Sequence, residues 1–200
     1  MSTDNKLFPI FLKLNELNIL VVGGGNVALE KLQALLKNDP NANVKVVADF
    51  VSNEVGDLIE KHSSVRLINR KYISYDLESV DIAILATDSP ALHYRIRQEA
   101  KQHGVILNVA DTPHLCDFYL GATVSKGNLK LGISTNGMSP TFAKRLREFF
   151  EQTIPDDTDE LLKNLRLIRD RLKGDFAFKV EELNKITKSL AANGLHKNHN

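Results

Sequence analysis

The sequence has little cysteine and little net charge. A single cysteine, Cys116, stands among 200 residues, which excludes an intramolecular disulfide and a cysteine-rich zinc site and favours a reducing compartment. The formal net charge is +1, so overall charge gives no reason to expect a nucleic-acid or membrane partner. The composition is that of an ordinary globular protein.

Targeting and membrane-spanning signals are also missing. The N-terminus reads MSTDNKLFPIFLKL and lacks the basic start, long apolar core and small-residue cleavage site of a signal peptide. No stretch of the sequence approaches the roughly 18 apolar residues that a membrane helix needs. We therefore expect a cytoplasmic protein with no membrane and no nucleic-acid partner.

A glycine-rich turn stands near the start of the chain. Residues 18–28 read NILVVGGGNVA, an apolar run and three glycines, and leucines at helical spacing follow. Such a strand-to-helix turn brings backbone N–H groups of a helix N-terminus close to a dinucleotide pyrophosphate. Gly23 allows the tight turn, Gly25 the close approach, and Ala28 the packing of helix on strand. The motif predicts a nucleotide site, although a plain glycine-rich turn also fits it.

Strand-like and helix-like segments alternate through the first half of the chain. Apolar strands are predicted at 19–22, 44–48, 65–68, 82–86 and 105–109, with helices near 30–37, 52–61 and 90–103. The segment 7–14, which contains Pro9, is expected at a sheet edge. Because most strands are apolar throughout, the pattern predicts an α/β fold with a Rossmann-like parallel sheet over residues 1–112.

The pattern changes after Pro113. A hairpin is predicted around Ser125-Lys126-Gly127-Asn128, followed by a helix that begins at Ser139-Pro140 and ends near Gln152. Two further helices are expected at 159–173 and 176–190, and His196 and His199 are assigned to a frayed tail. We therefore predict a small α+β segment over 113–152 and a C-terminal helical unit over 153–200.

Polar residues follow the predicted strands where ligands bind in such sheets, at the carboxyl ends. One crevice is expected to collect Gly23 to Asn26, Thr87 with Asp88, and Asn108 with Asp111. Asp49 is the nearest acid for the ribose hydroxyls, although it equally fits an exposed loop acid. No arginine stands between Val44 and Val55 to receive a 2′-phosphate, which favours NAD over NADP.

One locally basic segment, residues 126–150, has a single acid, Glu148. An anionic partner and a solvated helix face explain it equally well. Its basic residues are Lys126, Lys130, Lys144, Arg145 and Arg147.

Four segments together carry a family resemblance. In this order, GGGNVALEK, ATDSPALHYRI, NVADTP and ISTNGMSPTFAKRLRE resemble the precorrin-2 dehydrogenase and sirohydrochlorin ferrochelatase family of sirohaem synthesis. The resemblance covers nearly the whole chain and is strongest from Leu7 to Glu151. It implies a homodimer, with 113–152 as its dimerisation segment, and NAD-dependent oxidation of precorrin-2 to sirohydrochlorin. Some members also insert Fe²⁺. Fused members carry a methyltransferase domain after this region, so we expect methylation to belong to another protein.

The resemblance also implies roles for individual residues. Asp111 in NVADTP matches the family's catalytic aspartate. Its place after a buried strand independently suits proton transfer, although Asp-Thr-Pro also fits a turn. The predicted NAD contacts are Gly23, Gly25, Asn26, Val27, Asp49, Phe50, Thr87 and Asp88.

The expected substrate, precorrin-2, is a tetrapyrrole with many carboxylates. The residues predicted to bind it are Asn108, His114, Thr135, Ser139, Lys144, Arg145 and Arg147. Thr135 stands where some fused members have serine, and His114 where some members have lysine. No metal ligand is predicted. Two other functions stay open: an NAD-binding sensor module, and an NAD-dependent dehydrogenase of another small anion.

Overall fold

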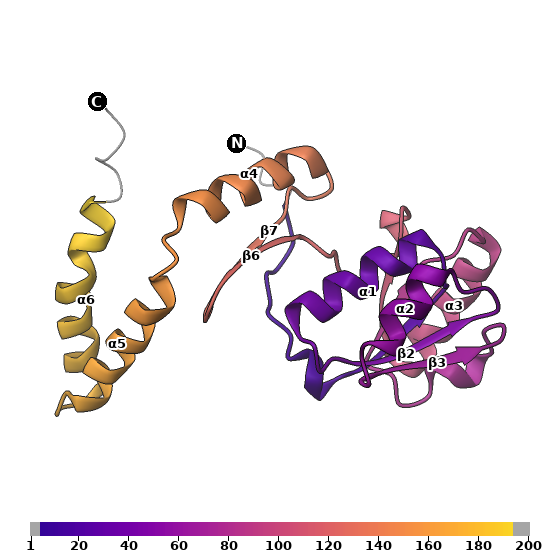
Figure 1. Ribbon diagram of the computed structural model, residues 1–200, viewed down its shortest axis with the longest axis horizontal. Helices are drawn as coiled ribbons and strands as arrows, with labels where there is room; N and C mark the ends of the chain where they lie inside the picture. Colours follow the sequence, from indigo (N-terminus) through magenta and orange to yellow (C-terminus); the bar gives the residue numbers. More distant parts are fainter. Residues whose placement is uncertain (1–4, 194–200) are drawn as a thin grey trace. The chain divides into compact units, whose positions relative to one another are not determined.

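The computed structural model describes residues 5–193, so the predicted tail residues His196 and His199 lie outside the described residues. The chain divides into two compact units, Met1–Leu120 and Gly121–Asn200. Figure 1 labels their helices α1 to α6 and the strands β2, β3, β6 and β7. Each unit is described by itself.

The first unit is built on a five-stranded sheet of order β3-β2-β1-β4-β5. Every neighbouring pair is parallel, and β1 lies at the centre. The predicted Rossmann-like α/β fold is therefore confirmed. The strands are β1 (Asn18–Val22), β2 (Asn43–Ala48), β3 (Val65–Asn69), β4 (Ile82–Leu85) and β5 (Ile106–Val109).

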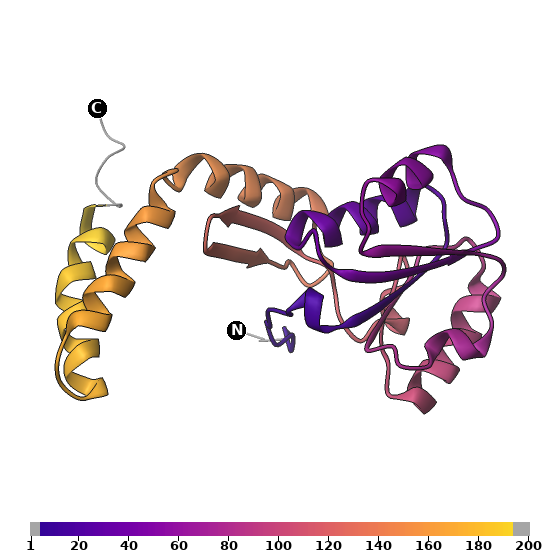
Figure 2. The same ribbon diagram turned by 60° about the horizontal axis from the view of Figure 1, so that its bottom comes forward.

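Helices cover both faces of this sheet, which explains why its strands are apolar throughout. Helices α1 (Asn26–Asn38) and α2 (Asn53–Glu60) lie over one face, and α3 (Pro90–His103) lies over the other (Figure 2). Strand residues alternate between the two cores: Val21 packs with α1, and Leu20 packs with α3. Helix α3 ends at Gly104, whose φ of +69° suits a residue without a Cβ.

Two connections differ from the expected pattern. Residues 7–13 form no strand, and a 3₁₀ turn, η1 (Leu14–Glu16), leads into β1. Pro9 has no N–H for a ladder, and Phe8 is 84% exposed. The expectation of a sheet-edge segment at 7–14 is therefore wrong. Between β3 and β4, the crossover contains only a second 3₁₀ turn, η2 (Ser74–Leu77).

A third 3₁₀ turn, η3 (Pro113–Leu115), follows β5. After it, Asp117 N–H donates to Leu107 O at 2.7 Å, so the chain returns to β5. This return is why the first unit extends to Leu120, beyond the predicted boundary at residue 112. The division into three domains stays a prediction.

The second unit contains an antiparallel hairpin, β6 (Ala122–Lys126) and β7 (Leu129–Ile133), and the helices α4 (Pro140–Thr153), α5 (Thr158–Arg171) and α6 (Phe176–Asn193). Gly127 forms the hairpin turn with a φ of +56°. The side chain of Asp159 at the start of α5 accepts hydrogen bonds from Asn128 N (2.7 Å) and Nδ2 (2.6 Å). The hairpin tip is therefore bound to the first turn of α5.

Among the described residues, no helix combines the length and the apolar character needed to cross a membrane.

Candidate functional site

The three glycines after β1 serve different purposes. Gly23 has a φ of +121°, and a Cβ there would collide with the carbonyl oxygen of Ala86 at the end of β4. A Cβ on Gly24 would collide with the carbonyl of Phe50. Gly25 is different, because no atom lies within 4 Å of the position its Cβ would take. The first two glycines let the chain pack closely, and the third leaves open space.

That open space lies at the N-terminus of α1. Helices α2, α3 and α4 each begin at a serine whose hydroxyl accepts a backbone N–H of the first turn. Helix α1 begins after Gly25, which has no side chain to do so. The N–H groups of its first turn, including those of Asn26 and Val27, therefore face an approaching anion with the positive end of the helix dipole.

A pocket of about 230 Å³ lies in the first unit beside this turn. It joins the start of α1 to residues that follow β4 and β5, at the carboxyl edge of the sheet where such folds bind ligands. It is lined by Val27, Thr87, Asp88, Pro90, His93, Ala110, Asp111 and Thr112. Val27, Thr87, Asp88 and Asp111 are residues that the sequence singled out.

Asp111 lies on the wall of this pocket with an unusual backbone. Its φ is +55°, in the left-handed region that L-residues rarely adopt and that Asp and Asn tolerate best. Its side chain is exposed, and no hydrogen bond or ion pair to it occurs among residues 5–193. A carboxylate held in a pocket without a partner is available to take a proton from a bound molecule.

His93 is a pocket residue that sequence reasoning missed. It is 5% exposed, and its Nε2 lies 2.8 Å from Thr87 Oγ1. Burial lowers the pKa of His93 below its ordinary value, more than the Thr87 contact raises it. The imidazole is therefore neutral at pH 7 and fixes the Thr87 hydroxyl at the pocket wall. The sequence did contain a signal for His93. It stands one turn after Ser89, the residue at which α3 begins, so it lies in the part of α3 that directly follows β4.

Four predicted site residues lie outside this pocket. Asn108 is buried, its Nδ2 donates to Phe118 O at 2.9 Å, and it does not line this pocket. Its amide is used to hold the chain after η3. Asp49 and Phe50 are exposed after β2 and do not line the pocket. His114 is exposed on η3, and its Nε2 lies 3.0 Å from the Tyr94 hydroxyl.

The remaining substrate candidates belong to the second unit. Thr135 Oγ1 bonds to both the N–H and the carbonyl of Ser139, at 3.2 and 3.1 Å. Ser139 Oγ accepts Phe142 N–H at 3.1 Å, so this serine begins α4 as predicted. The two side chains stabilise the turn into α4.

The basic segment is partly neutralised within its own unit. Arg145 donates to Glu148 at 2.7 Å, and Lys126 pairs with Asp156, outside the range counted from the sequence. Arg147 Nε is buried without a hydrogen bond and lies 3.9 Å from Glu151. Lys144 is exposed.

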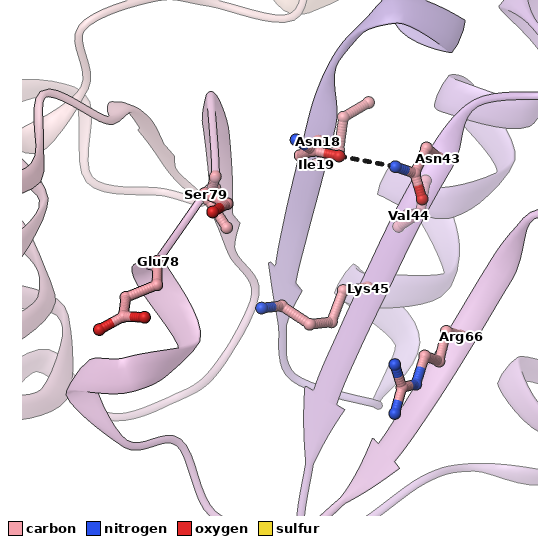
Figure 3. A pocket seen from close by; sticks show the side chains of 9 residues that line it. Asn18, Ile19, Asn43, Val44, Lys45, Arg66, Glu78 and Ser79 are labelled. Atoms are coloured by element: carbon pink, nitrogen blue, oxygen red, sulfur yellow. Dashed lines mark hydrogen bonds between the residues drawn. The ribbon is translucent and has the colours of Figure 1, made fainter.

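A second hollow, of about 250 Å³, lies at the opposite, amino edge of the sheet (Figure 3). Lys45 and Arg66 stand at paired positions of β2 and β3 there. Lys45 Nζ donates to Asp76 O at 2.8 Å, which fastens η2 to the sheet. No group of three potential metal ligands occurs among residues 5–193.

Comparison with known proteins identifies the first unit and part of the second. Residues 10–122 match a family model of NAD(P)-binding proteins, and residues 126–153 match one described as the central part of sirohaem biosynthesis proteins. The chain belongs to the NAD(P)-binding family that the first model describes, and its residues 126–153 match the central part of sirohaem biosynthesis proteins. The resemblance noted in the sequence is confirmed.

Several members of this sirohaem family are similar over most of the chain. A siroheme synthase of Psychrobacter cryohalolentis is 35% identical over 178 residues, 88% of this chain and 32% of that protein. A siroheme synthase of Methylococcus capsulatus is 36% identical over 82% of this chain and 34% of its own length. The chain thus spans about a third of the length of these relatives.

A solved structure of similar size matches throughout. The structure of SirC, a precorrin-2 dehydrogenase, has a TM-score of 0.68 and 27% identity. The match covers 90% of this chain and 89% of that one. The pocket described above therefore belongs to a sirohaem-family protein with an NAD(P)-binding fold.

Proposed function

We propose that this chain oxidises precorrin-2 to sirohydrochlorin with NAD as the cofactor. One observation carries the proposal: the unpartnered carboxylate of Asp111 shares a pocket with the start of α1 and the end of β4. The similarity of the chain to SirC, which covers 90% of this chain, supports the choice of substrate class.

The residues present fit a dinucleotide. The open space at Gly25 admits a pyrophosphate, and the first turn of α1 has N–H groups and a dipole to bind it. Thr87 and Asp88, on the far side of the pocket, are placed to orient the next part of the cofactor. Bound NAD supplies the hydride acceptor for the oxidation.

The protein's own chemical task is to accept a proton. Oxidation of a macrocycle by loss of hydride leaves a proton to be removed from the ring, and Asp111 is the free carboxylate in the pocket. Asp88 lines the same pocket, so two acids face the reacting region. The neutral His93 keeps the Thr87 hydroxyl in place and adds no positive charge beside Asp111.

Substrate carboxylates need cationic or N–H partners. We assign this role to Lys144, Arg145 and Arg147 on α4 and to the α4 N-terminus at Ser139. We also propose a cytoplasmic homodimer. Insertion of Fe²⁺ is a second candidate activity, in which Asp111 would accept the pyrrole protons and His114, held by Tyr94 at 3.0 Å, would meet the ion as substrate.

The test is NADH formation after anaerobic precorrin-2 is added to purified protein and NAD, followed by absorbance. We expect turnover by the wild type and a loss of about 100-fold or more in Asp111→Asn, which keeps the shape but cannot take the proton. Glu54→Gln, an exposed acid on α2, is the control and keeps full activity.

The outcomes separate the alternatives. An active Asp111→Asn variant refutes the assignment of the base but leaves the dehydrogenase in place. A folded protein that binds NAD and does not oxidise precorrin-2 indicates a sensor or another substrate. Fe²⁺ added to the sirohydrochlorin product then tests chelation.

A further inference from the structure

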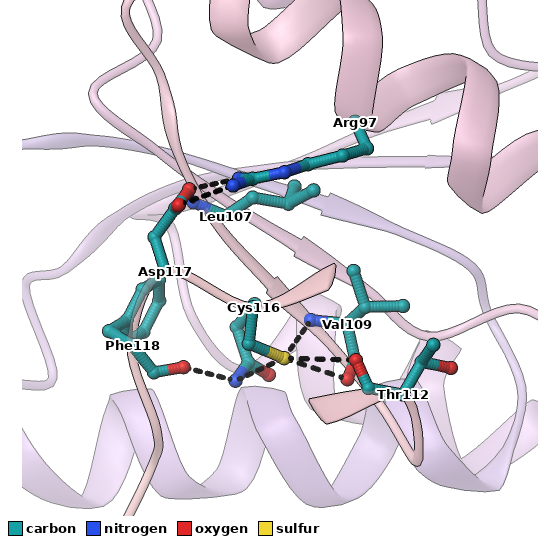
Figure 4. Close-up of polar contacts among 8 residues, drawn as sticks. Arg97, Leu107, Val109, Thr112, Cys116, Asp117 and Phe118 are labelled. Carbon is teal, nitrogen blue, oxygen red and sulfur yellow. Dashed lines mark hydrogen bonds and ion pairs between the residues drawn. The ribbon is translucent and has the colours of Figure 1, made fainter. Parts of the chain in front are cut away.

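The outer edge of β5 is bonded by side chains. β5 is the last strand of the sheet in the described part of the chain, so its outward N–H groups need acceptors other than a strand. Val109 N–H donates to Cys116 Sγ at 3.1 Å, and Leu107 N–H donates to Asp117 Oδ2 at 3.0 Å. Two consecutive residues, Cys116 and Asp117, thus accept hydrogen bonds from alternate N–H groups of β5 (Figure 4).

The Cys116 thiol bonds in both directions. Besides accepting from Val109, its S–H faces two carbonyl oxygens, that of Val109 at 3.2 Å and that of Thr112 at 3.5 Å. Burial raises the pKa of this thiol, so it keeps the proton that it donates. The sulfur therefore joins Val109, the last residue of β5, to Thr112 in the loop that follows the strand.

Asp117 fixes the position of its neighbour Cys116. Its carboxylate makes a two-pronged ion pair with Arg97 of α3, with Nη2 to Oδ1 at 2.7 Å. The Arg97 contact, aided by Leu107 N–H, holds the pKa of Asp117 below its ordinary value despite partial burial. Cys116 is consequently held between β5 and a residue anchored on α3.

The loop closed in this way contains Asp111. Its φ of +55° persists only where the surrounding chain fixes it, because a non-glycine residue has lower energy at negative φ. Relaxation to negative φ would turn the Cα–Cβ bond and carry the carboxylate away from its place on the pocket wall. The direction of this carboxylate therefore depends on what holds Val109 to Thr112.

We propose that Cys116 is a positioning residue that sets the direction of the Asp111 carboxylate through its thiol hydrogen bonds. The inference rests on the proposed function, since it concerns the same oxidation. Cys116 does not line the pocket, and its sulfur is already bonded to the backbone, so it acts on the reaction only through the loop.

The experiment compares Cys116→Ala and Cys116→Ser with the wild type. Alanine removes every hydrogen bond of the thiol, and we expect kcat for precorrin-2 oxidation to fall about 10- to 100-fold, the effect expected of a small misplacement of a reacting group. The Kd for NAD, measured by calorimetry, stays within about twofold, because the glycine turn is untouched. Serine offers the same acceptor and donor and keeps kcat within about threefold.

Val65→Ala is the matched control. Val65 is 6% exposed and lies on β3, at the other edge of the sheet. This variant lowers the melting temperature by leaving a cavity, and its kcat stays at the wild-type value.

Each other outcome overturns the inference. A wild-type kcat in Cys116→Ala, or an equal loss in the alanine and serine variants, refutes the hydrogen-bond role. Loss of NAD affinity in parallel with kcat indicates a merely structural residue. Absence of turnover in the wild type refutes the proposed function itself, together with the role given to Cys116. The wild-type assay alone distinguishes this outcome from the others.

Discussion

At the scale of single residues, Gly25 offers a test of cofactor binding that is separate from folding. A Cβ at Gly25 meets no atom within 4 Å, and its φ of −94° suits any L-residue. Gly25→Ala should therefore fold normally and place a methyl group where the pyrophosphate approaches. We expect the Kd for NAD to rise about tenfold or more, which corresponds to ~1.4 kcal/mol.

Calorimetric titration with NAD and a thermal melt measure the two effects. Gly24→Ala is the contrasting variant, since its methyl group would collide with the Phe50 carbonyl and should lower the melting temperature. Undiminished NAD affinity in Gly25→Ala would argue against a pyrophosphate at this turn.

The same residues mark the limit of what the sequence predicts. The roles of Gly23 and Gly25 could be predicted from the spacing of the motif, because only glycine allows the tight turn and the close approach of the backbone to a pyrophosphate. The left-handed backbone of Asp111 leaves no such trace, since Asp is common in many turns. The bond from Asn108 to Phe118 O could not be predicted either, because an amide at the end of a strand suits a ligand and a backbone carbonyl equally well.

At the scale of elements, one carboxylate, that of Asp159, binds the tip of the β6–β7 hairpin. Lys163 and the backbone and side chain of Asn128 lower the pKa of Asp159 from 3.8 to about 2. A carboxylate with a lowered pKa stabilises the folded state above its unfolded pKa, and that stabilisation is lost as the pH falls. The contribution is complete above pH 3.8 and disappears on titration through about pH 2.

Asp159→Asn should therefore be less stable than the wild type at pH 7, and the difference should shrink as the pH falls toward 2. Denaturant unfolding at several pH values measures it. Asp170→Asn is the control, because this exposed carboxylate meets only arginines of its own helix and its variant should track the wild type. A difference that does not change with pH would contradict the role of the charge.

Element boundaries were predicted best where the local signal is covalent or steric. Helix α3 begins at Pro90 and ends before Gly104 as expected, because proline favours the first turn and glycine the left-handed end. The return of residues 115–118 to β5 was not predicted. It depends on contacts between Asp117 and Arg97, two residues whose proximity the sequence pattern does not reveal.

At the scale of the whole molecule, the proposed homodimer needs an apolar surface. Phe142 and Phe149 on α4 are 57% and 56% exposed, and Met138 before it is 85% exposed. Exposed apolar side chains gathered on one element are typical of an interface. We expect Phe142→Asp combined with Phe149→Asp to shift the protein from dimer to monomer in sedimentation velocity, while α4 itself stays helical.

Tyr75→Asp is the control, since Tyr75 is 68% exposed on the first unit and lies outside the proposed interface. If the double variant of α4 sediments as the wild type does, the dimer contact does not lie on this helix.

The side-chain bonds on β5 also bear on how these molecules meet one another. An open strand edge can be extended by a strand from another chain, which is one route to aggregation. On β5 the N–H groups of Leu107 and Val109 already have acceptors, so an incoming strand finds no free donors there. Extension of the sheet by a strand from another molecule is therefore disfavoured on that side, and the same short segment that closes the loop around Asp111 also covers this edge of the sheet.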